Sequence, residues 1–295
     1  GLFNRPFGYS IVYSSGYRDF PERARVFQTL MPRERDLGAM LSYKPTKKFS
    51  FITAEIAVVN GSGLSARDYD SNKDIIGNLS FNFDSLASKK LHLGFGGSIY
   101  KGTVRSNTTT IYQPIDNGFA MGLDPNNENY NFRRDYYGAN LQVDYKNTFG
   151  ATSFKTEYIQ GTQPGVAASS SVSGLAASTS FATQPTGNLY LRNFNGYFFW
   201  LTQQIADTKL TAIIGYDVYD PNTDIDEVEI GKAGTNTTAG DIKFSTLGYG
   251  FTYNLNTRLK LTVYNEHVKN NATQLTNYQS DVKDNVFTTR LQYRW

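Results

Sequence analysis

The stretch FTTRLQYRW, Phe287–Trp295, decides the fold that the sequence predicts. Every second residue from Phe287 is apolar or aromatic, except for Thr289, and the residues between them are Thr288, Arg290, Gln292 and Arg294. Alternation with a period of two residues is typical of a β-strand whose two faces meet different surroundings. The sequence therefore predicts a closing strand with one face toward an apolar medium and the other toward water.

Ten earlier segments after residue 36 show the same alternation, so eleven strands are expected in all. In the segment around Ile56, for example, Ile52, Ala54, Ile56 and Val58 share one face, and Thr53 and Glu55 share the other. The segment Leu189–Leu201 is aromatic on both faces, which leaves its orientation open. The ten segments are Leu37–Tyr43, Phe49–Asn60, Asn78–Phe83, Leu91–Ile99, Tyr137–Tyr145, Phe154–Tyr158, Leu189–Leu201, Leu210–Val218, Thr246–Tyr253 and Leu259–Tyr264.

The connectors between these segments alternate between short and long. The short ones are Lys44–Lys48, Ser85–Lys90, Asn147–Ala151, Ala206–Thr208 and Asn254–Thr257. The long ones are Ser62–Asp74, Val104–Arg134, Thr162–Gly187, Pro221–Lys243 and Asn271–Lys283. A soluble sandwich also has alternating strands, but only transmembrane barrels combine short periplasmic turns with long extracellular loops. The pattern therefore predicts an all-β fold, an antiparallel transmembrane β-barrel.

Composition agrees with a barrel in the bacterial outer membrane. Aromatic residues make up 15% of the 295 residues and charged residues only 19%. No segment approaches the ~20 apolar residues of a membrane helix; the best one, Ile52–Val59, is interrupted by Glu55. The outer face is expected to contact outer-membrane lipid. The terminal pattern of Phe287, Leu291, Tyr293 and Trp295 is expected to be the signature that the barrel assembly machinery reads.

Strand parity extends this prediction to the N-terminus. If the C-terminus is periplasmic, counting back places residue 36 on the extracellular side. Bacterial single-chain barrels have an even number of strands, so at least one more strand is expected. Gly8–Ser14, with Tyr9, Ile11 and Tyr13 in phase, is a candidate that would give 12 strands. The other interpretation is that the chain begins partway round a larger barrel.

Residues 1–36 differ from the barrel strands at 37–295 and are expected to be a strand end and a constriction segment. Glu22–Leu30 predicts a short helix, with Asp19 as the N-cap, Pro21 in the first turn and Pro32 after the end. Folded into the lumen, this block would narrow it, and its arginines would bind anions. The alternative is that they pair with the neighbouring acids. The arginines are Arg18, Arg23, Arg25, Arg33 and Arg35, and the acids are Asp19, Glu22, Glu34 and Asp36.

The predicted lumen face also carries charge of both signs. Its cations are expected to be Lys155, Lys260, Arg290 and Arg294, and its acids Glu55, Asp144, Glu157, Asp217 and Glu266. A mixed set of this kind indicates a polar interior and does not by itself dictate anion preference.

The N-terminal block carries a resemblance to a known family. GLFNRPFG (1–8) and SSGYRDFPERARVFQTLMPRERDLGAMLSY (14–43) resemble the motif of the phosphate-selective porin O and P family, in particular its Bacteroidetes-type members. The resemblance covers about the first 45 residues and implies a passive, substrate-selective porin. It also implies a 16-stranded barrel in which several strands precede the motif, and hence a chain that lacks its N-terminal strands.

Catalytic and cofactor chemistry is not indicated. The chain has no cysteine, and its two histidines, His92 and His267, have no metal-binding spacing. A third interpretation, an enzyme, is the weakest, and it would depend on His267 with its polar neighbours. Neither a nucleic-acid motif nor a cofactor loop is recognisable.

The sequence thus predicts a non-enzymatic porin for passive diffusion of small hydrophilic solutes, with an anion or phosphate-like preference. A homotrimer is one expected assembly. The alternative prediction is a structural or interaction barrel, a subunit of a larger envelope complex with a blocked lumen.

Overall fold

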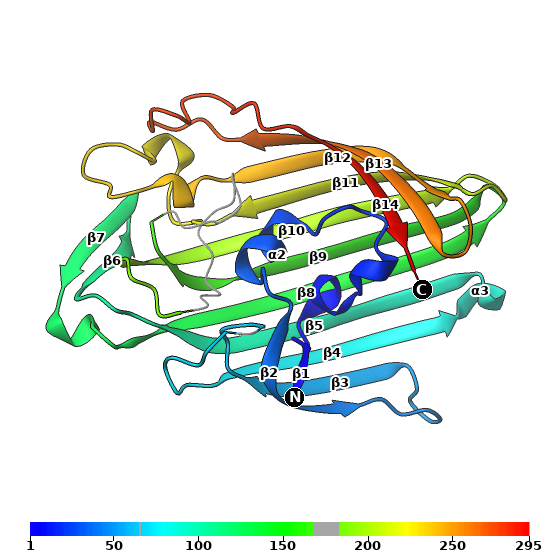
Figure 1. The fold of residues 1–295 in the computed structure, drawn as a ribbon, viewed down its shortest axis with the longest axis horizontal. Coiled ribbons are helices and arrows are strands. Elements are labelled where there is room, and N and C mark those ends of the chain that lie inside the picture. Colours follow the sequence, from blue (N-terminus) through cyan, green and yellow to red (C-terminus); the bar gives the residue numbers. More distant parts are fainter. Residues whose placement is uncertain (65, 168–182, 295) are drawn as a thin grey trace.

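The computed structural model describes residues 1–64, 66–167 and 183–294, and its dominant feature is one 14-stranded sheet (Figure 1). The strands on its main path are β1 (Leu2–Asn4), β2 (Arg35–Tyr43), β3 (Ile52–Val59), β4 (Asp74–Ser85), β5 (Leu91–Arg105), β8 (Asn131–Asn147), β9 (Gly150–Gly165), β10 (Leu189–Gln204), β11 (Leu210–Asp220), β12 (Phe244–Asn254), β13 (Leu259–Asn270) and β14 (Val286–Tyr293). Each pairs antiparallel with the next on this path. The eleven strands predicted after residue 36 are confirmed, and they form a curved antiparallel meander of barrel type.

The sheet is open between β14 and β1 in the part of the chain that the structure describes. β14 pairs with β13 and β1 with β2, and these are the two ends of the strand order. Among the described helices, none is long and apolar enough to cross a membrane.

The prediction of a strand at Gly8–Ser14 is wrong. Gly8–Val12 forms the short helix α1, and the Tyr13 N–H donates to the Tyr9 carbonyl at 2.9 Å. The place beside β2 is taken by β1, whose three residues pair with Arg35–Leu37. The chain then turns toward the sheet's inner face, where a helical turn puts Phe7 and Ile11 on one side and buries both completely.

The predicted helix Glu22–Leu30 is shorter than expected. Helix α2 spans Arg25–Leu30 and ends before Pro32, as predicted. Asp19 does not cap it, because its carboxylate pairs with Lys260 at 3.1 Å. Ala24 stands at the N-cap position without a side-chain hydrogen bond. The 3₁₀ turn η1 (Ser15–Tyr17) lies between α1 and α2.

The long connector after β5 contains a hairpin that the sequence analysis missed. β6 (Thr110–Ile115) and β7 (Gly118–Leu123) pair with each other, and β6 also pairs in parallel with the start of β10. Asn117 and Gly118 both have positive φ, at 60° and 158°. Because Ile115 pairs with Gly118, the turn residues are Asp116 and Asn117, and Asn is one of the residues that tolerate a positive φ in a turn.

The two faces of the sheet have the alternation that the sequence predicted. Leu41, Ile56 and Leu291 point outward and are 73%, 53% and 64% exposed. The ambiguous strand β10 turns Phe199 and Leu201 outward and buries Phe198 and Trp200 on the inner side. The main core therefore lies on the inner face, between the strands and residues 5–34, the N-terminal segment, which Figure 1 shows in blue in front of the sheet.

Candidate functional site

The N-terminal segment packs on the inner face of the sheet through aromatic contacts. Phe7 meets Tyr100 and Tyr136 edge to face, with ring centroids 6.5 and 6.4 Å apart. Further along, Phe20 stacks on Trp200 at 4.7 Å, and Phe27 meets Phe198 at 6.2 Å. All belong to one buried hydrophobic cluster. The segment is therefore a packed layer on the inner face.

Helix α1 fits against β9 so closely that its first residue must be glycine. Gly8 has a φ of +61°, and a Cβ there would lie 1.6 Å from Oε1 of Glu157. The Gly8 N–H donates to Ser98 Oγ at 2.8 Å, and the Ser10 N–H donates to Glu157 Oε2 at 2.9 Å. Positive φ and the lack of space both favour glycine at this position.

A buried ion pair ties the start of the segment to β2. Arg5 Nε and Nη2 donate to Asp36 Oδ2 at 3.0 and 2.7 Å, and Nη2 also donates to the Gly61 carbonyl. Arg5 is 1% exposed and Asp36 is fully buried. Asp36 therefore pairs with Arg5, which is outside the arginine set proposed from the sequence.

The four predicted lumen cations all lie on the inner side and contact the N-terminal segment. Lys260 Nζ donates to the Arg18 carbonyl at 2.7 Å and pairs with Asp19. Arg290 donates to the carbonyls of Pro21, Phe20 and Arg18 at 2.7, 3.2 and 3.3 Å. Lys155 lies near the rings of Tyr9 and Tyr13, and Arg294 near the ring of Tyr17. These cations hold the segment against the strands.

The five arginines predicted to line an anion path have different surroundings. Arg23 pairs with Glu34 and donates to the Ser10 carbonyl at 2.8 Å. Arg25 lies 4.4 Å from the centre of the Phe244 ring. Arg33 donates to the Leu64 carbonyl at 3.3 Å, and Arg35 donates to Asn4 Oδ1 at 3.2 Å. The fifth, Arg18, is 7% exposed and forms no ion pair with any of the residues that the structure describes.

Arg18 and Arg23 share a cavity of about 210 Å³ on the N-terminal segment, lined also by Glu22, Gln28 and Glu34. Nε and Nη1 of Arg18 and Nη2 of Arg23 are buried without a hydrogen-bond partner among the described residues. Burial and the nearby Arg23 charge lower the pKa of Arg18 to about 10. Arg18 therefore stays charged at neutral pH and keeps donors to offer a ligand.

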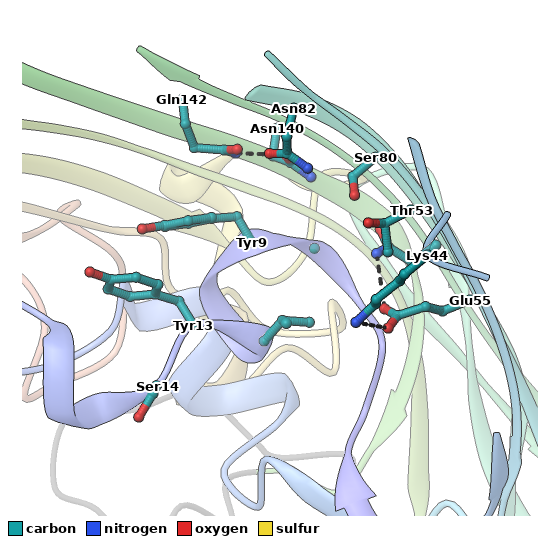
Figure 2. Close-up of a pocket in the computed structure, with 13 residues that line it drawn as sticks. Tyr9, Tyr13, Ser14, Lys44, Thr53, Glu55, Ser80, Asn82, Asn140 and Gln142 are labelled. Carbon is teal, nitrogen blue, oxygen red and sulfur yellow. Dashed lines mark hydrogen bonds and ion pairs between the residues drawn. The ribbon is translucent and has the colours of Figure 1, made fainter. Parts of the chain in front are cut away.

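A second cavity, of about 300 Å³, separates α1 from strands β3, β4 and β8 (Figure 2). One side is the stacked pair Tyr9 and Tyr13, whose ring centroids are 4.9 Å apart. The opposite wall is a polar arc of strand side chains: Thr53, Glu55, Asn78, Ser80, Asn82, Asn140 and Gln142. The alternation along each strand puts these residues on the polar face, as the sequence predicts for Thr53 and Glu55, but it does not predict the tyrosine pair opposite them.

The two histidines lie apart and serve turn and surface contacts. His92 Nδ1 lies 2.7 Å from Asp84 Oδ1, and His267 stacks with Tyr249. No group of three or more metal-binding side chains occurs in residues 1–64, 66–167 and 183–294. Of the predicted assembly signature, Phe287, Leu291 and Tyr293 point outward and are more than half exposed. Trp295 lies outside the described residues.

No protein-family description matches the sequence, and no curated protein matches it. Solved structures with a similar chain course are outer-membrane porins and related outer-membrane proteins. One is a porin refined at 1.8 Å resolution, with 14% identity and a TM-score of 0.47 over 88% of this chain, which spans 61% of that porin's length. Another is OmpT of Vibrio cholerae in its trimer form, with 12% identity and a TM-score of 0.48 over 100% of this chain and 76% of the other.

Proposed function

We propose that the chain forms a barrel wall in the bacterial outer membrane. The observation that carries this proposal is the outward face, where large apolar side chains stay exposed on consecutive strands, among them Ile56, Ile99, Ile214 and Leu247. Such a surface is unstable in water and stable against lipid tails. In this setting residues 37–295 are the wall, residues 1–36 are a strand end and the inner segment, and the lipid of the outer membrane is the first partner.

Closed into a barrel, this wall would surround a path for passive diffusion of small hydrophilic solutes. An anion preference, of the phosphate-like kind that the porin O and P resemblance implies, rests on Arg18 and Arg23. Both side chains line one cavity on the segment that would narrow the path, and each has buried guanidinium nitrogens without a hydrogen-bond partner among the described residues. Guanidinium groups stay charged at any relevant pH and match oxyanions through their fork of donors.

Single-channel reversal potentials in a salt gradient test this function. The unmodified chain is expected to conduct and to favour chloride or phosphate over potassium. The double variant Arg18→Gln and Arg23→Gln is expected to lose most of that preference. Arg33→Gln is the matched control, because Arg33 lies outside the shared cavity and contacts Leu64. Cation preference of the unmodified chain would refute the anion proposal, and absence of conductance would refute the diffusion path.

The alternative function is a structural barrel whose lumen is closed, a subunit of a larger envelope complex. The tight packing of the N-terminal segment favours it, since Phe7 and Phe27 are fully buried against the strands. Stable co-purification with partner proteins, together with no conductance at any voltage, would support this alternative. A homotrimer is a proposal for either function, and cross-linking in outer-membrane fragments tests it.

A further inference from the structure

The cavity between α1 and the sheet has a wall of neutral hydrogen-bonding side chains that the strand register places side by side. Thr53 pairs with Ser80, Ser80 with Gly96, and Gly96 with Asn140 across four strands. In the next row, Asn82 pairs with Gly94, and Gly94 with Gln142. The polar side chains of β3, β4 and β8 therefore converge on one stretch of the inner face.

Gly94 and Gly96 of β5 lie at the centre of this wall and leave space there, because they have no side chains. A Cβ at Gly94 would lie 2.5 Å from Gln142 Oε1 and 2.9 Å from Asn82 Oδ1, and one at Gly96 would lie 2.7 Å from the Leu79 carbonyl oxygen. Without side chains at these two positions, the amides of Asn82 and Gln142 lie close to β5 and leave the cavity open in front of them. Glycine in a strand interior often marks such a close approach.

Several groups in the wall have hydrogen-bonding capacity to spare. The side chains of Thr53, Ser80 and Asn82 form no hydrogen bond among the residues that the structure describes. Gln142 donates to Asn140 Oδ1 at 2.7 Å, which orients both amides and leaves other lone pairs and protons unused (Figure 2). Amides and hydroxyls can each donate and accept, so they match ligand hydroxyls of either orientation.

The opposite side of the cavity is aromatic and uncharged. Tyr9 and Tyr13 stack on each other, and burial raises the pKa of both hydroxyls, so they stay neutral. The only charged groups in the lining, Lys44 and Glu55, neutralise each other in an ion pair of 2.9 Å. The cavity thus combines an aromatic surface with a polar wall in which Lys44 balances the charge of Glu55, so its lining carries no net charge.

We propose that this cavity binds a neutral pyranose, with the C–H face of the sugar against the Tyr9 and Tyr13 side and its hydroxyls on the amide and hydroxyl wall opposite. A sugar ring is the ligand class that presents both kinds of surface: axial C–H groups on one face and hydroxyls around the rim. The volume of about 300 Å³ is at the small end of ligand pockets, which suits one or two rings. This inference deepens the proposed function by naming a solute class, and it concerns a cavity separate from the one that Arg18 and Arg23 share.

Saturation-transfer NMR on the detergent-folded chain tests the inference with methyl β-D-glucopyranoside as the probe. The axial ring protons are expected to receive most of the transfer. Asn82→Ala is expected to weaken binding about two- to tenfold, the value of one or two lost hydrogen bonds. Gly94→Ala is expected to weaken it as well, because the new Cβ displaces the two amide ends. Gly97→Ala is the matched control: it lies on the same strand, and its nearest atom would be 3.6 Å away.

The outcomes separate this inference from the proposed function. Equal transfer in Gly94→Ala and the unmodified chain would overturn it, and so would equal transfer to mannitol, which has hydroxyls but no ring face. Competition by inorganic phosphate at equal concentration would overturn the neutral preference. The binding measurement needs no open channel, so a non-conducting chain that binds the glucoside would refute only the diffusion path.

Discussion

Phe27 is the residue on which the attachment of the N-terminal segment can be tested most directly. Its side chain is fully buried and meets Phe198 of β10 edge to face. It belongs to helix α2, and no strand hydrogen bond depends on it. Phe27→Ala should therefore weaken the docking of the segment and leave the strand ladders intact.

The magnitude follows from the cavity that the substitution leaves. Removal of a fully buried phenylalanine side chain costs about 3–5 kcal/mol, from lost transfer free energy and unfilled space. That cost corresponds to about a 10²- to 10⁴-fold rise in the undocked population of the segment. The ion pair of Lys260 with Asp19 and the hydrogen bond from Arg290 to the Pro21 carbonyl remain, so the segment should open locally while the sheet stays folded.

Limited trypsin digestion measures this opening without any assumption about transport. Arg18 and Arg23 are 7% and 9% exposed, so the docked segment should resist cleavage there. Phe27→Ala should raise the cleavage rate after these residues, while heat-dependent migration on gels, which reports the strands, stays close to that of the unmodified chain. Phe199→Ala is the matched control, because Phe199 lies next to Phe198 in β10 but points outward, away from the segment. Equal cleavage rates in Phe27→Ala and the control would refute the docked arrangement.

Three further substitutions or conditions test other contacts. Asp36→Asn leaves the Arg5 charge buried without its counter-ion and should lower the free energy of unfolding in urea by about 3–5 kcal/mol. Asp68→Asn is the control: it breaks a partly exposed ion pair with Lys73 and should cost about 1 kcal/mol or less. Gly8→Ala should expose the segment to trypsin as Phe27→Ala does, because its Cβ would overlap Glu157, and an unchanged cleavage pattern would contradict the close fit. Burial lowers the pKa of Arg18 only to about 10. The anion preference should therefore be constant between about pH 6 and 8, and it should fall as the pH rises past 10, where Arg18 loses its proton and its positive charge. Reversal-potential measurements that show a fall already near neutral pH would contradict this pKa.

The strand pattern was predictable because one physical rule fixes it. Successive side chains of a strand point to opposite faces, so the phase of Ile56 against Glu55 or of Leu141 against Gln142 assigns both faces at once. In the structure Ile56 is exposed and Glu55 is buried, as that phase requires. Eleven strands could be counted because each contained several such pairs.

The N-terminal segment was less predictable because local pattern competes there with tertiary contacts. The alternation of Tyr9, Ile11 and Tyr13 also fits a strand, but seven residues are too few to distinguish it from a helical turn. What decides the conformation is the contact of Gly8 with Glu157, some 149 positions further along the chain, as the numbering shows. Likewise, the Asp19 cap was lost to Lys260, a partner that no local rule could identify.

The segment whose orientation the sequence left open, Leu189–Leu201, has a composition that reflects the layer packed on its inner side. Leu189–Leu201 is aromatic on both faces, and in the structure it lies within β10, with Phe199 outward and Phe198 and Trp200 buried inward. Large aromatic side chains on the inner side of a strand are unfavourable if that side faces water, so an apolar layer is needed to cover them. Phe20 packs on Trp200 and Phe27 on Phe198, and they form this layer.

The converse holds for the part of β4 from Asn78 to Asn82, where the inward side chains are all polar. Asn78, Ser80 and Asn82 of β4 line open space, because a neutral polar surface gains nothing from apolar contact and is best left to water or to a polar ligand. The character of the inward residues along each strand therefore divides the inner face into a part that is covered by the segment and a part that is left open. The proposed sugar cavity lies in the open part, beside the first residues of the segment that covers the rest.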